Sequence, residues 1–378
     1  MKTKIRKSLA TILALVMVLS MVSFASAQVF PDIPESLDSA ATRLAGLGII
    51  AGYPDGTFRP DNNITRGEFA KIAVIVLGLE KSADLLENVP SNFKDVKVGD
   101  WYNKYVNVAA NQGILKGYPD GTFKPNSNIT QAEALTIVLR LLGYKEDHLP
   151  GNWPYNYVTQ ADRIGLLDAG FDTGLAASRG WVADLVSRAL DTATVTWADD
   201  EGFKEGKALI DRSFGGQVIE AVRVVSALVA STGDTITVAD DDGKKTTLNV
   251  AANAVINGAA FADLRNHKVD LTTKLVSGKE YVVAIDVLST KVTGEVKAIN
   301  NFTRVATIGT TEVVFRDGTT LPQKGKTITA YIFLGEVYDW EEPREENYGE
   351  ITDITIGASN TITINVKFEK VDSPFGPV

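Results

Sequence analysis

Basic and aromatic residues recur at a fixed spacing in the first half of the chain, and they are the residues best suited to hold a ligand. The loop GYPDGTFRP at residues 52–60 returns as GYPDGTFKP at residues 117–125. Each copy supplies a tyrosine and a cation at matching positions, namely Tyr53 with Arg59 and Tyr118 with Lys124. A match of nine residues does not arise by chance, so we interpret the two loops as copies of one unit.

Two arginines stand where a helix is expected to begin. Arg66 follows Thr65, and Arg179 follows Ser178, residue types that cap helices. A guanidinium presents a fork of N–H donors that suits a carboxylate. The free N–H groups of a first helical turn also favour an anion. The second copy carries Gln131 at this position, so we expect anion binding at the two arginines and doubt it at Gln131.

Each copy contains two predicted helices that position these residues. Apolar residues at 37, 40, 41, 44 and 47 fall on one helical stripe, and Gly48 suits a left-handed cap. The patterns T-x-x-E at 65–68 and 130–133 are capping boxes that open the second helix. A third, weaker copy begins at Trp153 and lacks the nine-residue loop. Since one short helix pair cannot bury its own apolar face, we expect the three pairs to pack together.

The first 27 residues are predicted to be a secretory signal. A basic start is followed by an apolar run from Leu9 to Val22 and by Ala-Ser-Ala at residues 25–27, an A-x-A cleavage site. The run is short for a membrane span, and no later stretch is as long as a span requires, so the mature chain should have none. An uncleaved anchor is the alternative.

Composition excludes several classes of protein. The chain has 378 residues, no cysteine, two histidines and three methionines, all three within the signal. Disulfides, thiolate metal sites and cysteine nucleophiles are therefore excluded. Removing the four basic residues of the signal from the 38 leaves 34 against 47 acidic residues, a net charge of -13. Such a chain should not bind nucleic acid or anionic membranes non-specifically.

The second half is predicted to be β-rich. A charged segment at residues 199–213 is interpreted as a linker, followed by two small β domains of barrel or sandwich type at 214–300 and 301–378. A weak repeat, Gly followed by alternating apolar residues, begins at 216, 294 and 349. We expect no cofactor or metal. Calcium at the acidic segment 341–346 is an open alternative.

At these motifs the first half resembles S-layer homology modules, the triplet that attaches bacterial surface proteins to the cell wall. The resemblance covers about residues 28–195. It implies three modules, at 28–88, 89–148 and a degenerate 149–198, in an all-α bundle with pseudo-threefold symmetry. It also implies that the spaces between modules bind a secondary cell-wall polysaccharide, often bearing a pyruvyl ketal. The chain as a whole would then be a multidomain α + β protein.

The resemblance also suggests which residues bind the polysaccharide. The two arginines would take the ketal carboxylate, and the aromatic rings would stack on sugars. Glycines would allow the backbone to approach the ligand. The full set is Arg66, Arg179, Trp101, Gly52, Tyr53, Gly117, Tyr118, Arg59, Lys124, Asp32 and Asp95. Because the second copy has Gln131 in place of the arginine and the third copy lacks the loop, we expect one good groove, and two are possible.

Taken together, the sequence predicts a secreted, non-catalytic protein of the cell wall or S-layer, on the extracellular surface. Its helical half would anchor it to polysaccharide, and its β domains would form or attach to a surface lattice. One alternative is an adhesin or scaffold whose β domains bind a protein partner by strand pairing. Another is a wall-anchored glycoside hydrolase, which needs two carboxylates at a set separation. The sequence gives neither the exact glycan nor the lattice symmetry.

Overall fold

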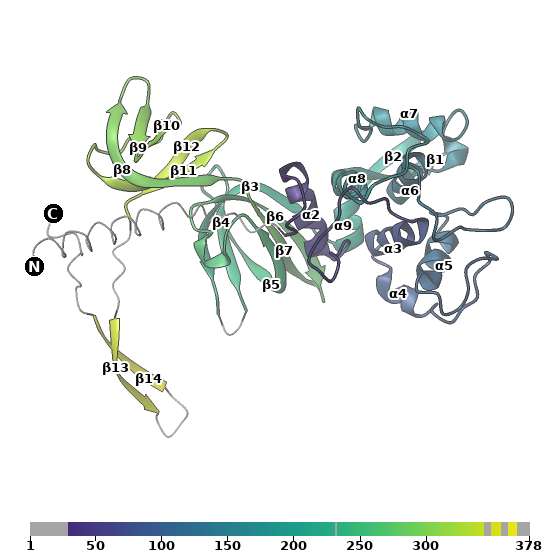
Figure 1. Cartoon of the computed structure of the whole chain (residues 1–378), viewed down its shortest axis with the longest axis horizontal. Helices are drawn as coiled ribbons and strands as arrows, with labels where there is room; N and C mark the ends of the chain where they lie inside the picture. Colours follow the sequence, from purple (N-terminus) through teal and green to yellow (C-terminus); the bar gives the residue numbers. More distant parts are fainter. Residues whose placement is uncertain (1–28, 231–232, 344–348, 357–361, 369–378) are drawn as a thin grey trace, which may run out of the picture. The chain divides into compact units, whose positions relative to one another are not determined.

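The chain has a mixed α + β fold in two compact units (Figure 1). The structure is a computed structural model that describes residues 29–230, 233–343, 349–356 and 362–368. The boundary between the units falls between Leu288 and Ser289. The predicted signal, residues 1–27, lies outside the described residues. Among the helices within these ranges, none is long and apolar enough to cross a membrane.

The first unit begins with three helix pairs that follow one another along the chain. Loops and short helices connect the helices. The pairs are α2 (Glu35–Leu47) with α3 (Arg66–Val76), α5 (Asn103–Asn111) with α6 (Gln131–Leu142), and α7 (Tyr155–Arg163) with α8 (Arg179–Asp191). Two short helices, α4 (Glu80–Asp84) and η1 (Glu146–His148), lie in the connections. The predicted helices of the first half are confirmed. Gly48 ends α2 in the left-handed conformation, with φ of 79°.

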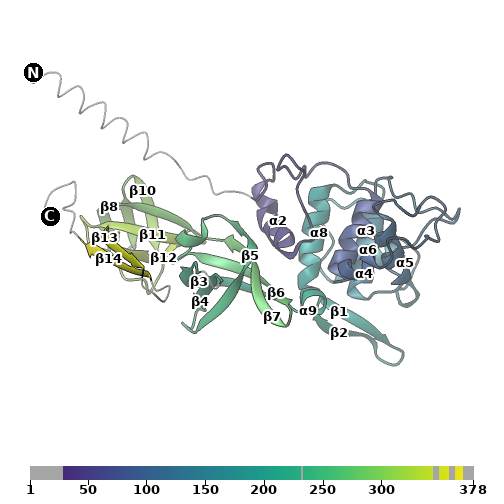
Figure 2. The same cartoon turned by 90° about the horizontal axis from the view of Figure 1, so that it is seen from below.

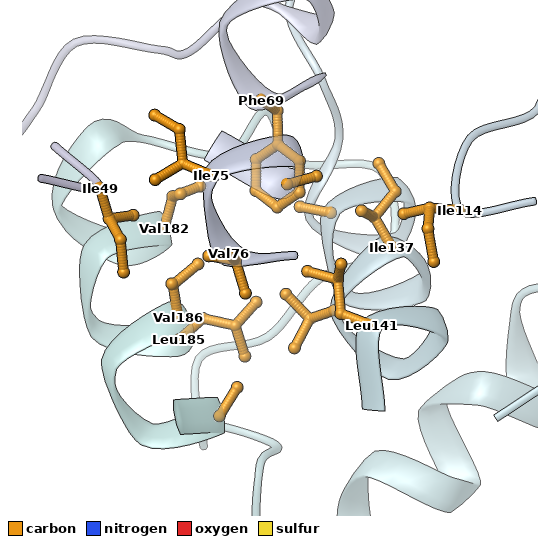
Figure 3. Packing of buried hydrophobic residues seen from close by; sticks show 14 of the residues in the cluster. Ile49, Phe69, Ile75, Val76, Ile114, Ile137, Leu141, Val182, Leu185 and Val186 are labelled. Carbon is orange, nitrogen blue, oxygen red and sulfur yellow. The ribbon is translucent and has the colours of Figure 1, made fainter. Parts of the chain in front are cut away.

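The second helices of the three pairs share one hydrophobic core (Figure 3). Phe69 and Val76 of α3, Leu141 of α6 and Leu185 of α8 meet in it, each at most 1% exposed. Thr65 and Thr130 form complete capping boxes with Glu68 and Glu133, as predicted. The caps fix where α3 and α6 begin, and so fix the residues at their first turns.

The predicted linker at 199–213 is wrong, because this segment is folded. Strand β1 (Ala193–Ala198) pairs antiparallel with β2 (Gly202–Ala208), and α9 (Leu209–Phe214) follows directly. The rings of Trp197 and Phe203 lie 4.9 Å apart, and Trp197 stacks on His148 at 4.3 Å. This aromatic cluster stabilises the hairpin. The acidic residues of the turn between the two strands made the segment look like a linker in the sequence.

A closed five-stranded barrel completes the first unit. Its strands are β3 (Val218–Leu228), β4 (Thr235–Ala239), β5 (Lys245–Asn257), β6 (Lys268–Val276) and β7 (Lys279–Val287), with a short helix η2 (Phe261–Asp263) before β6. The order around the barrel is β3-β4-β5-β7-β6, and β6 pairs with β3 to close it. Only β5 and β7 run parallel. The architecture is a small Greek-key barrel of the OB type.

The second unit contains a second closed barrel with the same strand order. It is built from β8 (Thr290–Asn300), β9 (Val305–Ile308), β10 (Thr311–Phe315), β11 (Thr327–Phe333) and β12 (Glu336–Glu341). Strand β8 pairs with β9 and β11, so the predicted domain boundary near residue 300 is wrong by one whole strand. The predicted β barrels are confirmed. Strands β13 (Gly349–Ile356) and β14 (Ile362–Phe368) form a separate antiparallel hairpin.

The first barrel is not an independent domain, because helix α2 packs on it (Figure 2). Helix α2 contacts β5 and β7 on one side and α8 on the other. The contact is close enough to require a glycine: a Cβ atom at Gly46 would lie 2.4 Å from the carbonyl oxygen of Val283. The first barrel is therefore packed directly on the helical part of the unit and does not follow a linker.

The α2–barrel contact can be tested by adding a side chain at Gly46. The substitution Gly46→Val should lower the free energy of unfolding by about 1–3 kcal/mol, since the β7 backbone cannot move away without breaking barrel pairing. Denaturant unfolding measures this. Gly170→Ala is the matched control, because a Cβ there meets no atom within 4 Å. An unchanged unfolding midpoint for Gly46→Val would contradict the packing.

Candidate functional site

Three junctions join the helix pairs in a ring, and each is formed by the start of one helix and the loop of another pair. We call them junction A (start of α3 with residues 116–128), junction B (start of α6 with residues 165–176) and junction C (start of α8 with residues 51–63). Isolated β-bridges mark all three: Thr65 with Asn128, Thr130 with Ala176, and Ser178 with Asn63. Arginine and loop at each junction thus come from different repeats.

The backbone at these helix starts is already hydrogen-bonded to the neighbouring loop. In junction A the N–H groups of Arg66 and Gly67 donate to the carbonyls of Ser127 (2.9 Å) and Pro125 (2.8 Å). In junction C those of Arg179 and Gly180 donate to Asn62 and Pro60, both at 2.8 Å. The expectation that free N–H groups of the first turn would take an anion is therefore wrong for these four amides.

Arg66 in junction A is buried and fully engaged. Its guanidinium donates to the carbonyl of Phe123 (2.8 Å), to the carboxylate of Glu133 (2.7 Å) and to the carbonyl of Lys116 (3.2 Å). The residue is 5% exposed, and its guanidinium carbon lies 4.8 Å from the centre of the Tyr118 ring. All three nitrogens are used inside the protein, so the predicted open fork toward a ligand is not present at Arg66. Sequence reasoning gave Glu133 only its capping role and missed this ion pair.

Arg179 in junction C occupies the same place with fewer partners. It donates to the carbonyls of Phe58 (2.8 Å) and Ala51 (3.2 Å), and its guanidinium lies 5.0 Å from the Tyr53 ring. It is half-buried and makes no ion pair with any of the described residues. Its positive charge is therefore uncompensated and partly open to solvent.

The loop cations lie over the loop tyrosines in both complete junctions. The Arg59 guanidinium is 4.0 Å from the centre of the Tyr53 ring, and the Lys124 ammonium is 4.1 Å from that of Tyr118. Both residues have positive φ, 58° and 57°, which is costly outside glycine and often retained at functional positions. Arg59 also pairs with Asp55 at 2.7 Å, whereas Lys124 makes no ion pair among the described residues.

Asp32 and Asp95 fix the backbone of these loops by accepting hydrogen bonds from it. The two oxygens of Asp32 accept from the N–H groups of Phe58 (2.7 Å) and Arg59 (2.6 Å), and Asp95 repeats this with Phe123 and Lys124. Burial raises the pKa of the Asp32 carboxyl, but the backbone N–H groups of Phe58, Arg59 and Asp32 itself together outweigh it, and the pKa lies below its ordinary value. These aspartates fix the strained loop conformation, and the contacts give them a positioning role.

The loop glycines that recur in both copies, Gly52 and Gly117, are explained by packing inside the protein. A Cβ at Gly52 would lie 2.6 Å from the Phe30 ring, and one at Gly117 would lie 2.3 Å from the Phe93 ring. The glycines thus admit an aromatic ring of their own repeat. Approach of a ligand to the backbone is not needed to account for them.

Trp101 lies beside junction A. It is 53% exposed, and its ring meets the edge of Tyr102 with centroids 5.4 Å apart. A Cβ at Gly67 would be 3.4 Å from the Cβ of Tyr102, which links this aromatic pair to the start of α3. Trp153, which the sequence interpretation did not select, is its counterpart in the third pair. It is 47% exposed, and its indole N–H donates to Thr136.

Junction B lacks both the arginine and the nine-residue loop that junctions A and C contain. Gln131 replaces the arginine and is 5% exposed, and its amide oxygen accepts from the N–H of Asp172. The facing loop, from the third pair, lacks the nine-residue motif. Because arginine and loop are exchanged between pairs, the missing arginine and the missing loop fall in the same junction. Arg66 meets the second copy's loop and Arg179 meets the first copy's loop, so two of the three junctions hold the full set of arginine, tyrosine and loop cation.

The described residues hold no group of three or more His, Cys, Asp or Glu side chains that could bind a metal ion. The acidic segment 341–346, where calcium was an open alternative, lies partly outside the described residues.

Comparisons with known proteins agree on the helical half. The family description "S-layer homology domain" matches residues 29–70 and 92–135. A middle cell wall protein of Brevibacillus brevis is 37% identical over 160 residues, 42% of this chain and 15% of that protein. A cell surface protein of Thermoanaerobacter kivui is 31% identical over 247 residues, 62% of this chain and 31% of that protein. An exoglucanase of Acetivibrio thermocellus is 30% identical over 152 residues, 36% of this chain and 13% of that protein.

The chain spans less than a third of the length of these relatives. The family match falls in the helical half, which carries the junctions described above, and the relatives include cell-wall and cell-surface proteins. The helical half thus matches the S-layer homology domain at residues 29–70 and 92–135, and the chain is similar to cell-wall and surface-layer proteins.

Proposed function

We propose that the helical half anchors the protein to an acidic secondary cell-wall polysaccharide, bound at junctions A and C, and that the barrels form or join a surface layer. The observation that most strongly supports this proposal is the repeated set of an arginine, a tyrosine and a loop cation at these two junctions. Cations gathered on aromatic rings suit a sugar that bears a carboxylate, including a pyruvyl ketal. They also offset the repulsion between such a polymer and a mature chain of net charge -13.

The residues of each set have different roles in this proposal. At junction C, Arg179 contacts the ligand carboxylate, since it has no carboxylate partner among the described residues. At junction A the available cation is Lys124, and Arg66 is a positioning residue that holds Tyr118 and the loop. Tyr53, Tyr118 and Trp101 offer ring faces for stacking.

The third helix pair acts as a third, degenerate module that completes a pseudo-threefold bundle. Ser178 caps α8 by accepting from the N–H of Trp181, as the threonines cap α3 and α6. The bridges at junctions B and C support this, since the third pair contributes the loop to one and the helix start to the other. Its binding position, junction B, has lost the cations and is not expected to take an anionic ligand.

The proposed function is non-catalytic, although a relative is an exoglucanase. One candidate for a hydrolytic site is a cavity of about 220 Å³ between α2, α8 and the first barrel, which Glu220, Asp270 and Asp286 line. Its volume is below the range of about 300–1,000 Å³ usual for ligand sites. Asp270 accepts from the N–H of Ala221, and Asp286 accepts from the Asn257 amide, so both carboxylates are tied to the barrel. These features favour a structural role for the carboxylates of this cavity.

Binding to the wall can be tested with the mature chain and purified wall sacculi. We expect co-sedimentation with intact sacculi and none after the polysaccharide is stripped. Arg179→Ala should weaken binding about tenfold, the loss of one charge-assisted hydrogen-bonding group. Gln131→Ala is the matched control and should bind within about twofold of the wild type. Retained binding to stripped sacculi, or equal effects of the two substitutions, would contradict the proposal.

The positioning role of Arg66 predicts an effect on stability. Arg66→Ala leaves the Glu133 carboxylate without its ion-pair partner at a site where its side chain is 17% exposed. The free energy of unfolding should fall by about 3 kcal/mol. Arg179→Ala breaks no ion pair and should cost clearly less. Denaturant titration measures both, and the double variant Arg66→Ala/Glu133→Gln should recover part of the loss. Equal stabilities of the two single variants would count against the distinction.

A further inference from the structure

The second barrel displays one aromatic side chain almost entirely in solvent. Phe302, in the turn between β8 and β9, is 95% exposed, the most exposed large apolar residue of the described chain. A phenylalanine in this position loses the stabilisation that burial gives, about 1.5–3 kcal/mol, unless it is covered by something else. The turn therefore merits a functional explanation.

The turn that carries Phe302 is held rigidly. The Asn300 side-chain oxygen accepts from the N–H groups of Phe302 (2.9 Å) and Thr303 (3.0 Å). The Arg304 guanidinium donates to the carbonyls of Phe315 (3.1 Å), Arg316 (2.8 Å) and Thr319. A side chain presented on a rigid turn loses little entropy on binding, which is the property of a preformed contact.

A free cation stands beside this turn. Arg316 is exposed, and its guanidinium makes no ion pair with the described residues. Its carbonyl accepts from Arg304, two residues after Phe302, so the two side chains belong to one end of the barrel. Phe302 and Arg316 together form what we call the barrel tip.

The first unit contains a pocket of matching chemistry. It has a volume of about 540 Å³ and lies between α9 and the first barrel. Ile210, Val218 and Leu275 supply its apolar wall, and Leu275 is 48% exposed there. Glu220 and Glu280 line the same pocket. Glu280 accepts from the Thr273 hydroxyl (2.7 Å), whereas Glu220 is exposed and has no ion-pair partner among the described residues.

We propose that the barrel tip of one molecule docks in this pocket of a second copy of the chain. Phe302 fills the apolar wall at Leu275, and Arg316 pairs with Glu220. The volume lies within the range of about 300–1,000 Å³ that is usual for ligand sites. The two surfaces are different, so the contact is head-to-tail and leaves one tip and one pocket free at the ends of any assembly. Such a contact extends an array instead of closing a dimer.

This inference deepens the proposed surface-layer role and rests on it for its biological purpose, but it does not depend on wall binding. It can therefore be measured in solution without sacculi. Sedimentation velocity of the mature chain over a range of concentrations should show concentration-dependent association. Phe302→Ser should weaken it at least tenfold. Leu85→Ser is the matched control, because Leu85 is also strongly exposed, at 82%, but lies on the helical part.

A charge exchange tests the pocket itself. Arg316→Glu and Glu220→Arg should each weaken association at least tenfold, and a mixture or double variant that restores opposite charges should recover it. All variants should keep the wild-type melting temperature and the wild-type binding to sacculi, which separates this inference from the anchoring proposal. Wild-type protein that stays monomeric at all concentrations overturns the inference. So does unchanged association of Phe302→Ser, or a charge exchange that restores nothing.

Discussion

The amide groups at the starts of α3, α6 and α8 need acceptors once these helices are packed together, and they find them on the loop of another helix pair. A helix start leaves several N–H groups without intrahelical partners. Here the threonine and serine caps satisfy some of them, and the carbonyls of Ser127, Leu175 and Asn62 satisfy the first amide of each helix. This exchange of hydrogen bonds forces every loop against the neighbouring pair. The composition of each junction, and with it the proposed binding chemistry, follows from that constraint.

The local structure of the helical half could be predicted from the sequence. Which helix start is hydrogen-bonded to the loop of which other pair could not be predicted. Capping boxes, the apolar stripe of α2 and the left-handed cap at Gly48 depend on residues a few positions apart. Which loop meets which arginine depends on packing between repeats of similar sequence, and a periodic pattern does not distinguish contacts within a copy from contacts between copies. For the same reason the burial of Arg66 was not foreseen. Its partners are mostly backbone carbonyls, which leave no mark in a sequence.

The barrels show a second reason why sequence patterns do not determine domain boundaries. The weak repeat at residues 216, 294 and 349 does mark equivalent strands, since β3 and β8 take the same place in two barrels with the same strand order. The repeated residues begin inside β8, however, so a boundary drawn after them separates the strand from its barrel. Hydrogen bonding to β11 starts at Thr290, where the sequence gives no turn signal. The hairpin β13–β14 begins at the third instance of the repeat, and its two strands pair antiparallel, as β3 with β4 and β8 with β9 do.

Helix α8 connects the proposed anchoring site to the first barrel mechanically. Its first residue, Arg179, belongs to junction C, and its last, Asp191, forms a two-point ion pair with Arg43 of α2 at 2.6 Å. The same α2 is in close contact with β7 at Gly46. A continuous series of contacts therefore runs from the barrel through α2 and α8 to the loop that carries Tyr53 and Arg59. In a chain with no cysteine, this series of contacts relies on close packing and charged hydrogen bonds, and it lets an anchored module fix the orientation of the barrel packed on it.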